Sequence, residues 1–314
     1  MSIIVITQSA FGQSTSLYET VAQPPLSVFS TRINPSFDPT QLTQVINYVI
    51  DKFNGTCPPE VAIYIHGFNR DQSGAGEEFN RVQMSFNQNN YTIPVIGFSW
   101  ISNTDWENAK INAKANGPEL SKFIIGLKKE NNCPNTNIHI IAHSLGAAVV
   151  DSTLVNLDFY LDSKTSNNNS KLIKSVHLLG AAINNKLIAK NTPFGSATEH
   201  TVENFYNLYN SQDNGLEFNR GFEKHDPLGL IGLPSEDFPG NYNQINVTSQ
   251  IPALSDADGD GNIEECFEEY KPTLKKGDNH CGYIGFRAPF SASLVNDGVM
   301  NIIVNDWTNS NPWQ

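Results

Sequence analysis

Continuous apolar runs alternate with segments of helical periodicity along the chain. Strands that are buried on both faces read as uninterrupted apolar runs, whereas strands with one solvated face alternate apolar and polar residues. The pattern therefore predicts an α/β fold, in which helices cover both faces of a mostly parallel central sheet. The predicted strands span residues 61–65, 93–98, 138–142, 173–183, 201–210 and 242–249.

Helical segments follow these strands. A flexible loop at 71–76 precedes a predicted helix over 77–87, and a long amphipathic helix is predicted over 105–129. Further helices are predicted after Gly146 and, near the end of the chain, over 291–305. This alternation of strand and helix is typical of a parallel sheet.

Ser144 lies between a predicted strand and a predicted helix, in the sequence AHSLG. This is the context of a nucleophile elbow, which lifts a serine hydroxyl clear of the sheet, within reach of a histidine base and backbone N–H donors. The usual pattern has glycine where this chain has Ala142. A serine that caps a helix after a buried strand is the alternative interpretation.

Together with HGFN at 66–69 and GFSW at 97–100, the elbow resembles the α/β-hydrolase superfamily, and within it the lipase and esterase branch with a single-glycine oxyanion loop. The resemblance covers residues 60–213 well and implies one α/β-hydrolase domain over 1–314, with loop insertions after strands seven and eight. It also implies that the backbone N–H groups of Phe68 and Leu145 bind the oxyanion. His66 is expected to hold the loop together rather than to transfer protons.

In this superfamily the acid and the histidine follow the nucleophile along the chain. Asp213 follows the predicted seventh strand and is the expected acid, with Asp226 and Asp237 as the other candidates; an exposed turn aspartate is the alternative. His280 is the expected base, because an eighth strand fits between Asp213 and His280 but not before His225.

An acidic loop lies within the predicted insertion at 250–279. Its oxygen-bearing side chains alternate, with Gly261 at the sixth position, as in the calcium loop of an EF-hand. Phe267 stands where that loop carries its last glutamate, so Glu264, Glu265, Glu268 or a group elsewhere must substitute. A structural Ca²⁺ ion is predicted, with a solvated acidic turn as the alternative and no organic cofactor expected. The predicted ligands are Asp256, Asp258, Asp260, Asn262 and Glu264.

The four cysteines fall where two disulfides could form. Cys57 and Cys133 each precede a strand, and these strands are neighbours in the sheet that the resemblance implies. Cys266 and Cys281 would close a loop of about 15 residues, worth roughly 3 kcal/mol in the chain-entropy model. Four buried free thiols are the alternative.

Composition limits the partners and the location. A net charge of −12 argues against nucleic acid, and no apolar run is long enough to cross a membrane. Residues 1–13 read either as the remnant of a secretory signal or as a first strand. With the predicted disulfides, a secreted or cell-surface location is favoured over a cytoplasmic one. The sequence does not specify an oligomeric state.

The sequence therefore predicts a serine esterase or lipase that acts on a small-molecule ester or lipid. The apolar segment 214–241 is either a partial lid over the acyl pocket or a loop packed on the sheet edge. A lactonase, a thioesterase or an acyltransferase could use the same triad. A non-catalytic calcium-dependent binding protein on a hydrolase scaffold is the alternative from another class.

The calcium prediction can be tested by chelation. We expect EDTA to lower both the melting temperature and the activity, and added Ca²⁺ to restore them, because the ion would order the loop that delivers His280. Differential scanning fluorimetry and an activity assay measure the two effects. If chelation changes neither quantity and added calcium restores nothing, the prediction is wrong.

Overall fold

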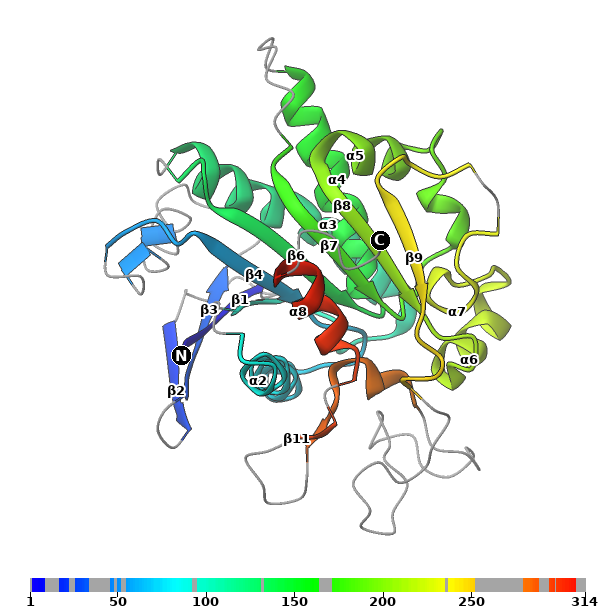
Figure 1. Ribbon diagram of the computed structural model, residues 1–314, viewed down its shortest axis with the longest axis horizontal. Coiled ribbons are helices and arrows are strands. Elements are labelled where there is room, and N and C mark those ends of the chain that lie inside the picture. The colour runs from blue at the N-terminus through cyan, green and yellow to red at the C-terminus, as the bar shows by residue number, and fades with distance from the viewer. Residues whose placement is uncertain are drawn as a thin grey trace.

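A mixed sheet runs through the protein (Figure 1), with the strand order β2-β3-β1-β5-β4-β6-β7-β8-β9. β2 and β3 are antiparallel, and every other neighbouring pair is parallel. The mostly parallel sheet predicted from the sequence is therefore confirmed. The computed structural model describes residues 2–8, 17–22, 26–33, 46–47, 50–51, 55–91, 95–130, 133–163, 171–234, 237–251, 279–287, 294–296 and 298–308. The strands are β1 (Ser2–Gln8), β2 (Leu17–Ala22), β3 (Leu26–Ile33), β4 (Glu60–Ile65), β5 (Val95–Ser99), β6 (Asn137–His143), β7 (Ile173–Leu179), β8 (Val202–Tyr209) and β9 (Tyr242–Asn246).

Helices cover both faces of the sheet. α3 (Trp106–Ile125), which continues as the π-helical turn η1 (Gly126–Glu130), packs with α4 (Gly146–Ser163) and α5 (Pro193–Thr201) on one face. α2 (Gln72–Gln88) and α8 (Met300–Thr308) cover the other face (Figure 1). Because successive strand residues point to opposite faces, Ile63 of β4 packs in the first layer and Tyr64 in the second.

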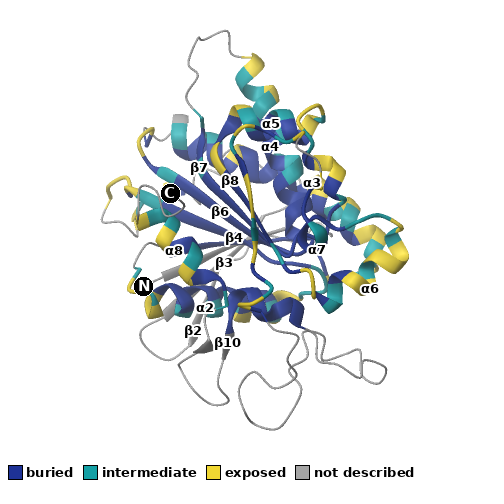
Figure 2. Ribbon diagram, turned by 45° about the vertical axis from the view of Figure 1, so that its right-hand side comes forward, coloured by how far each residue is buried: buried dark blue, intermediate teal, exposed yellow. Residues whose placement is uncertain are grey.

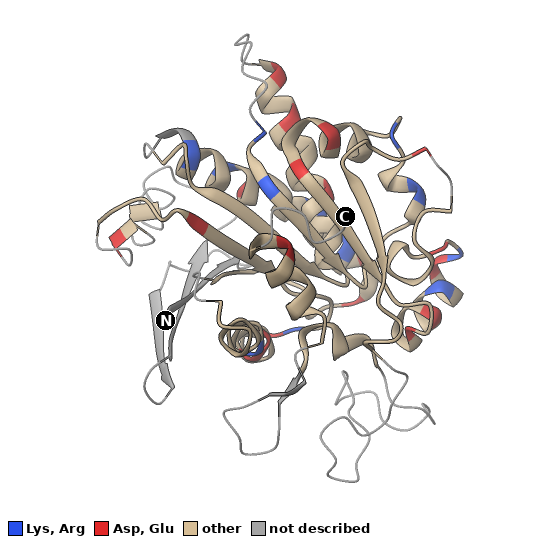
Figure 3. Ribbon diagram, viewed as in Figure 1, with Lys and Arg blue, Asp and Glu red and all other residues tan. Residues whose placement is uncertain are grey.

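The strands between these layers are buried and carry few charges. Figure 2 shows the strands of the sheet's middle as almost wholly buried, and in Figure 3 most charged residues lie on helices and connections. Every residue of β5, and every residue of β4 and β6 after the first, is buried. This burial explains why these strands read as uninterrupted apolar runs in the sequence.

Two helices begin elsewhere than the sequence predicts. The expected loop at 71–76 is wrong, because α2 begins at Gln72, where the Asp71 carboxylate caps it by accepting a hydrogen bond from the Gly74 amide at 2.8 Å. The last helix begins at Met300 rather than at 291, since 294–296 form the strand β11 (Leu294–Asn296), paired with β10 (Phe286–Arg287). Gly298, at φ +59°, separates β11 from the helix.

The segment that follows Asp213 divides into an exposed and a buried part. Phe218 and Phe222 of α6 (Asn214–Glu223) are mostly exposed and pack edge to face, with ring centroids 4.8 Å apart. Leu228 and Leu230 of α7 (Leu228–Ile231) lie in the hydrophobic core. Within 214–241, α6 is therefore the part with large exposed aromatic side chains.

Ser2–Gln8 forms a strand inside the sheet, where β1 pairs with β3 on one side and with β5 on the other. Of the two interpretations of residues 1–13, the structure thus describes a strand at 2–8. Among the helices that the structure describes, none is both long and apolar enough to cross a membrane.

Cys57 and Cys133 form the predicted disulfide, with their Cα atoms 5.4 Å apart. They precede β4 and β6, which are neighbours in the sheet. The disulfide therefore joins the two strands at their amino ends, away from the carboxyl ends that carry the loops after β4 and β6.

Replacing both residues by serine should lower the free energy of unfolding. The disulfide links residues separated by 76 positions, and the loss of a cross-link of that span costs about 4 kcal/mol in the chain-entropy model. Urea unfolding of the wild type and of Cys57→Ser/Cys133→Ser measures this difference. Equal unfolding midpoints with equal slopes would show that the cross-link contributes nothing.

Candidate active site

Ser144 occupies a strained turn between β6 and α4. Its φ of +54° lies in the left-handed region, which costs an L-residue about 1–3 kcal/mol and persists only where the surrounding structure imposes it. The Ser144 amide donates to the Leu179 carbonyl at 2.9 Å, and the Ser144 carbonyl accepts from the Ala182 amide at 3.1 Å. The end of β7 thus holds the turn on both sides of the serine.

Two glycines allow the loop after β4 to approach this turn. A Cβ atom at Gly67 would lie 2.8 Å from the Ser144 Cβ, and one at Gly146 would lie 2.8 Å from the carbonyl oxygens of Ile65 and His66. The methyl group of Ala142 causes no such clash, since it is buried in the core cluster that includes Ile65. Alanine is therefore compatible with the elbow at this position.

Asp213 and His280 are brought together by elements far apart in the sequence. Asp213 follows β8 and caps α6, while His280 lies in the 3₁₀ helix η3 (Asn279–Ile284). The His280 Nδ1 lies 2.8 Å from the Asp213 Oδ2, and both side chains are buried. Because a carboxylate only accepts, Nδ1 carries the proton and Nε2 is left as the basic nitrogen.

Asn279 fastens the histidine loop to the segment around Asp213. Its side-chain oxygen accepts from the Asn214 amide, and its Nδ2 donates to the Gln212 carbonyl, each at 3.0 Å. Of the other acid candidates, Asp226 pairs with Arg220, and Asp237 is exposed. The structure thus brings Asp213, and neither alternative, to His280.

Ser144 and His280 line one small pocket, and Asp213 accepts a hydrogen bond from His280. Phe68 also lines this pocket, and Leu145 follows the serine directly. Within the described part of the chain, neither the Phe68 amide nor the Leu145 amide donates a hydrogen bond. Both amides are therefore available to a ligand. The lining residues are Gly67, Phe68, Arg70, Glu78, His143, Ser144, His280 and Cys281.

His66 supports the loop after β4. Its Nε2 accepts from the Trp100 amide at 3.1 Å, so its Nδ1 carries the proton and donates to the Gly67 carbonyl at 2.9 Å. The Trp100 indole lies parallel to the imidazole and donates to the His66 carbonyl at 2.9 Å. Burial lowers the pKa of His66 to about 4, so the ring is neutral at pH 7. This is the structural role expected from the sequence.

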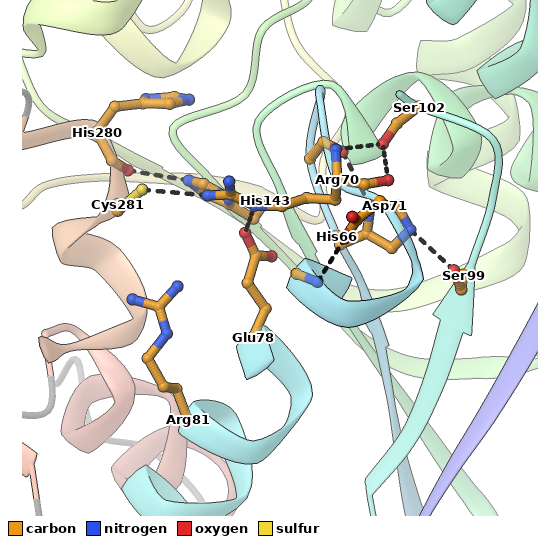
Figure 4. Close-up of polar contacts among 12 residues, drawn as sticks. His66, Arg70, Asp71, Glu78, Arg81, Ser99, Ser102, His143, His280 and Cys281 are labelled. Atoms are coloured by element: carbon orange, nitrogen blue, oxygen red, sulfur yellow. Dashed lines mark hydrogen bonds and ion pairs between the residues drawn. The ribbon is translucent and has the colours of Figure 1, made fainter. Parts of the chain in front are cut away.

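His143 joins the elbow directly to the histidine loop (Figure 4). Its Nε2 donates to the His280 carbonyl at 2.9 Å, and the two rings lie 4.8 Å apart. Burial, and then the neighbouring His280, lower the pKa of His143 to about 4. A neutral His143 adds no charge beside His280 at pH 7.

An ion pair that was not predicted from the sequence also lines the pocket. Arg70 Nε lies 2.5 Å from Glu78 Oε1, and the Tyr64 hydroxyl donates to Glu78 Oε2 at 3.0 Å. Burial raises the pKa of Glu78, but Arg70 and other nearby cationic groups outweigh it and lower the pKa to about 2. A signal was present in the sequence: Glu78 falls on the same helix face as Phe79 and Val82, where an unpaired charge would not be buried.

Cys281, next to His280, is disulfide-bonded and accepts a hydrogen bond from Arg70 Nη2 at 3.5 Å (Figure 4). Its predicted partner Cys266 lies outside the described residues, as do all five predicted calcium ligands, Asp256, Asp258, Asp260, Asn262 and Glu264. The calcium site therefore stays a prediction from the sequence.

The fold agrees with a comparison against known families. Residues 42–264 match the family described as an alpha/beta hydrolase of unknown function (DUF900). The chain belongs to this family. The α/β-hydrolase fold predicted from the sequence is thus confirmed, and the match in this α/β hydrolase includes Ser144 and Asp213 but ends before His280. The comparison with curated proteins finds no match.

Replacing Glu78 by glutamine should destabilise this α/β hydrolase at neutral pH. The variant leaves the Arg70 guanidinium beside the pocket without its carboxylate, which typically costs about 3–5 kcal/mol for a buried pair. Glu119→Gln is the matched control, because its partner Lys122 is half exposed and such pairs contribute about 1 kcal/mol or less. Chemical unfolding of the variants at pH 7 measures both costs.

The same pair predicts a pH dependence. The pKa of Glu78 is lowered to about 2 on folding, so its stabilisation is present above the unfolded pKa near 4.5 and is lost as the pH falls towards 2. The difference in unfolding free energy between wild type and Glu78→Gln should therefore shrink by about 3 kcal/mol across this window. A difference that stays constant from pH 5 to pH 2 would contradict the assignment.

Proposed function

We propose that this α/β hydrolase cleaves carboxylic esters, with Ser144 as nucleophile, His280 as base and Asp213 as the acid that orients the histidine. The observation that carries the proposal is the buried 2.8 Å contact between His280 and Asp213, at a pocket that His280 shares with Ser144 on its strained turn. A serine hydroxyl needs such a base, because it is a weak nucleophile at neutral pH.

In the proposed reaction, the Ser144 oxygen attacks the ester carbonyl while His280 Nε2 accepts the hydroxyl proton. The Asp213 carboxylate stabilises the imidazolium that forms. His280 then gives the proton to the leaving alcohol, which leaves an acyl-enzyme. Water, activated by His280, attacks the acyl group, and the released serine recovers its proton.

The amides of Phe68 and Leu145 are the proposed oxyanion donors. Both lie beside Ser144 along the pocket and the elbow, and neither donates to a described protein group. One such donor accounts for about 10²–10³ in rate where it has been removed in other enzymes. His66, His143 and the loop glycines fix the backbone that carries the two amides, so the donors are in place before the substrate binds.

The exposed aromatic face of α6 favours an acyl chain or another apolar group as part of the substrate. Phe218 and Phe222 project from a helix whose first turn is capped by Asp213. A partial lid formed by α6 would shield the acyl-enzyme from water. Disulfides persist in oxidising compartments, so the disulfide between Cys57 and Cys133 supports a secreted or cell-surface location.

Hydrolysis of p-nitrophenyl esters of increasing acyl length tests the proposal. We expect Ser144→Ala to lose at least about 10⁴-fold in kcat/KM, and Asp213→Asn to lose about 10³–10⁴-fold, because the triad residues act as one unit. Ser163→Ala, at the exposed end of α4, is the matched control and should retain wild-type rates. Equal rates for Ser144→Ala and the wild type would overturn the proposal and favour a binding protein.

A further inference from the structure

Tyr283 lies three residues after His280 in η3. A 3₁₀ helix has three residues per turn, so side chains at positions i and i+3 lie above one another on the same face. The rings of His280 and Tyr283 accordingly stand edge to face, with centroids 6.2 Å apart. The short helix therefore presents both rings to the same neighbour.

That neighbour is the Asp213 carboxylate. The Tyr283 hydroxyl donates to Asp213 Oδ2 at 3.1 Å, and the same oxygen accepts from His280 Nδ1 at 2.8 Å. The other oxygen, Oδ1, accepts from the Leu216 amide at 2.9 Å. With both oxygens bonded, the carboxylate cannot rotate without losing a donor, so its orientation towards His280 is fixed.

The tyrosine ring is itself held in place. It is fully buried, and a Cβ atom at Gly180, which follows β7 at φ +53°, would lie 2.6 Å from the ring. The Tyr283 carbonyl accepts from the Val299 amide at 3.0 Å, which anchors the backbone to the segment before α8. The ring therefore has no room to swing away from Asp213, whose oxygen lies closer to the hydroxyl than the Gly229 carbonyl at 3.5 Å does.

The hydroxyl is also held in its donating form. Burial, and then the negative charge of Asp213, raise the pKa of Tyr283 well above its usual range. A protonated phenol beside a carboxylate donates a charge-assisted hydrogen bond, which is stronger than a bond between neutral groups.

We infer that Tyr283 is a positioning residue of the proposed triad, which fixes the Asp213 carboxylate and withdraws part of its charge from His280. The inference rests on the proposed function. Without the hydroxyl, Asp213 would be less well oriented and would stabilise the imidazolium more strongly. The base would then be worse placed and would be protonated at a higher pH.

Tyr283→Phe should lower kcat about tenfold, the size expected for losing a hydrogen bond to a charged group. The acidic limb of the pH–rate profile should move to higher pH by roughly half a unit, because activity requires neutral His280. Among the described residues, the other titratable and charged groups around His280 are Asp213, His143, Arg70 and Glu78, and this variant leaves them unchanged. Stopped-assay rates from pH 4.5 to 9 measure both effects.

Tyr206→Phe is the matched control. Tyr206 is also buried and its hydroxyl donates to a carboxylate, that of Asp306 in α8, at 2.6 Å, but it does not line the pocket. A loss of stability common to both substitutions would appear in both variants, whereas a displaced acidic limb should appear in Tyr283→Phe alone. Adding Tyr283→Phe to Asp213→Asn should change the residual rate less than twofold, because the tyrosine acts through Asp213.

A stronger hydrogen-bond donor at position 283 should displace the acidic limb of the pH–rate profile in the opposite direction. Fluorotyrosine placed at position 283 has a more acidic hydroxyl, so the acidic limb should move to lower pH. This variant also keeps the test open if Tyr283→Phe does not fold. NMR titration of the His280 ring reads the same displacement without any substrate.

The outcomes separate the two proposals. Ester hydrolysis that survives in Ser144→Ala would overturn the proposed function, whatever His280 does. An acidic limb and a His280 titration that are the same in wild type, Tyr283→Phe and the fluorotyrosine variant would overturn the role of Tyr283 alone. Equal displacements in Tyr283→Phe and Tyr206→Phe would also overturn it, since the effect would then be structural.

Discussion

The carboxylate of Asp213 has no contact with water, and a buried charge is stable only where protein groups replace its hydration. Its donors come from the first turn of α6, the ring of His280 and the hydroxyl of Tyr283. These donors tie two segments, α6 and η3, to the end of β8. The requirement to solvate one charge thus joins η3, α6 and the end of β8 into one unit. A buried polar network of this kind is stable only when every member has its partner.

The elbow depends on a second constraint, which is space. Ser144 adopts its unfavourable backbone angle because the end of β7 bonds it on both sides and because glycine at positions 67 and 146 lets the loop after β4 approach. His143 then links the elbow to the backbone of His280. The elbow and the histidine loop are therefore connected by the bond from the His143 imidazole to the His280 carbonyl, which limits how far the serine and the histidine can move apart.

Much of this arrangement could be predicted from the sequence, because strands that are buried on both faces consist mainly of apolar residues. The strands in the middle of the sheet are mostly apolar, and Ser144 follows from the AHSLG motif. Asp213 and His280 follow from the chain order of the superfamily that the sequence resembles. Glycines at 74 and 76 concealed the start of α2, whose stripe of buried residues outweighs their low helix propensity. The contact of Tyr283 with Asp213 could not be predicted, because it joins segments 70 residues apart that meet only after folding.

Ala142 shows which parts of the nucleophile motif are steric requirements. Its side chain points into the core beside Ile65, whereas a side chain at Gly146 would strike the backbone of the neighbouring strand. Of the two glycines in the usual G-x-S-x-G pattern, only the second is sterically required in this chain. A search for similar sites that demands glycine on both sides of the serine would pass over this protein. A search that asks for a small residue first, glycine last and a partner glycine after the neighbouring strand of the sheet would retrieve it.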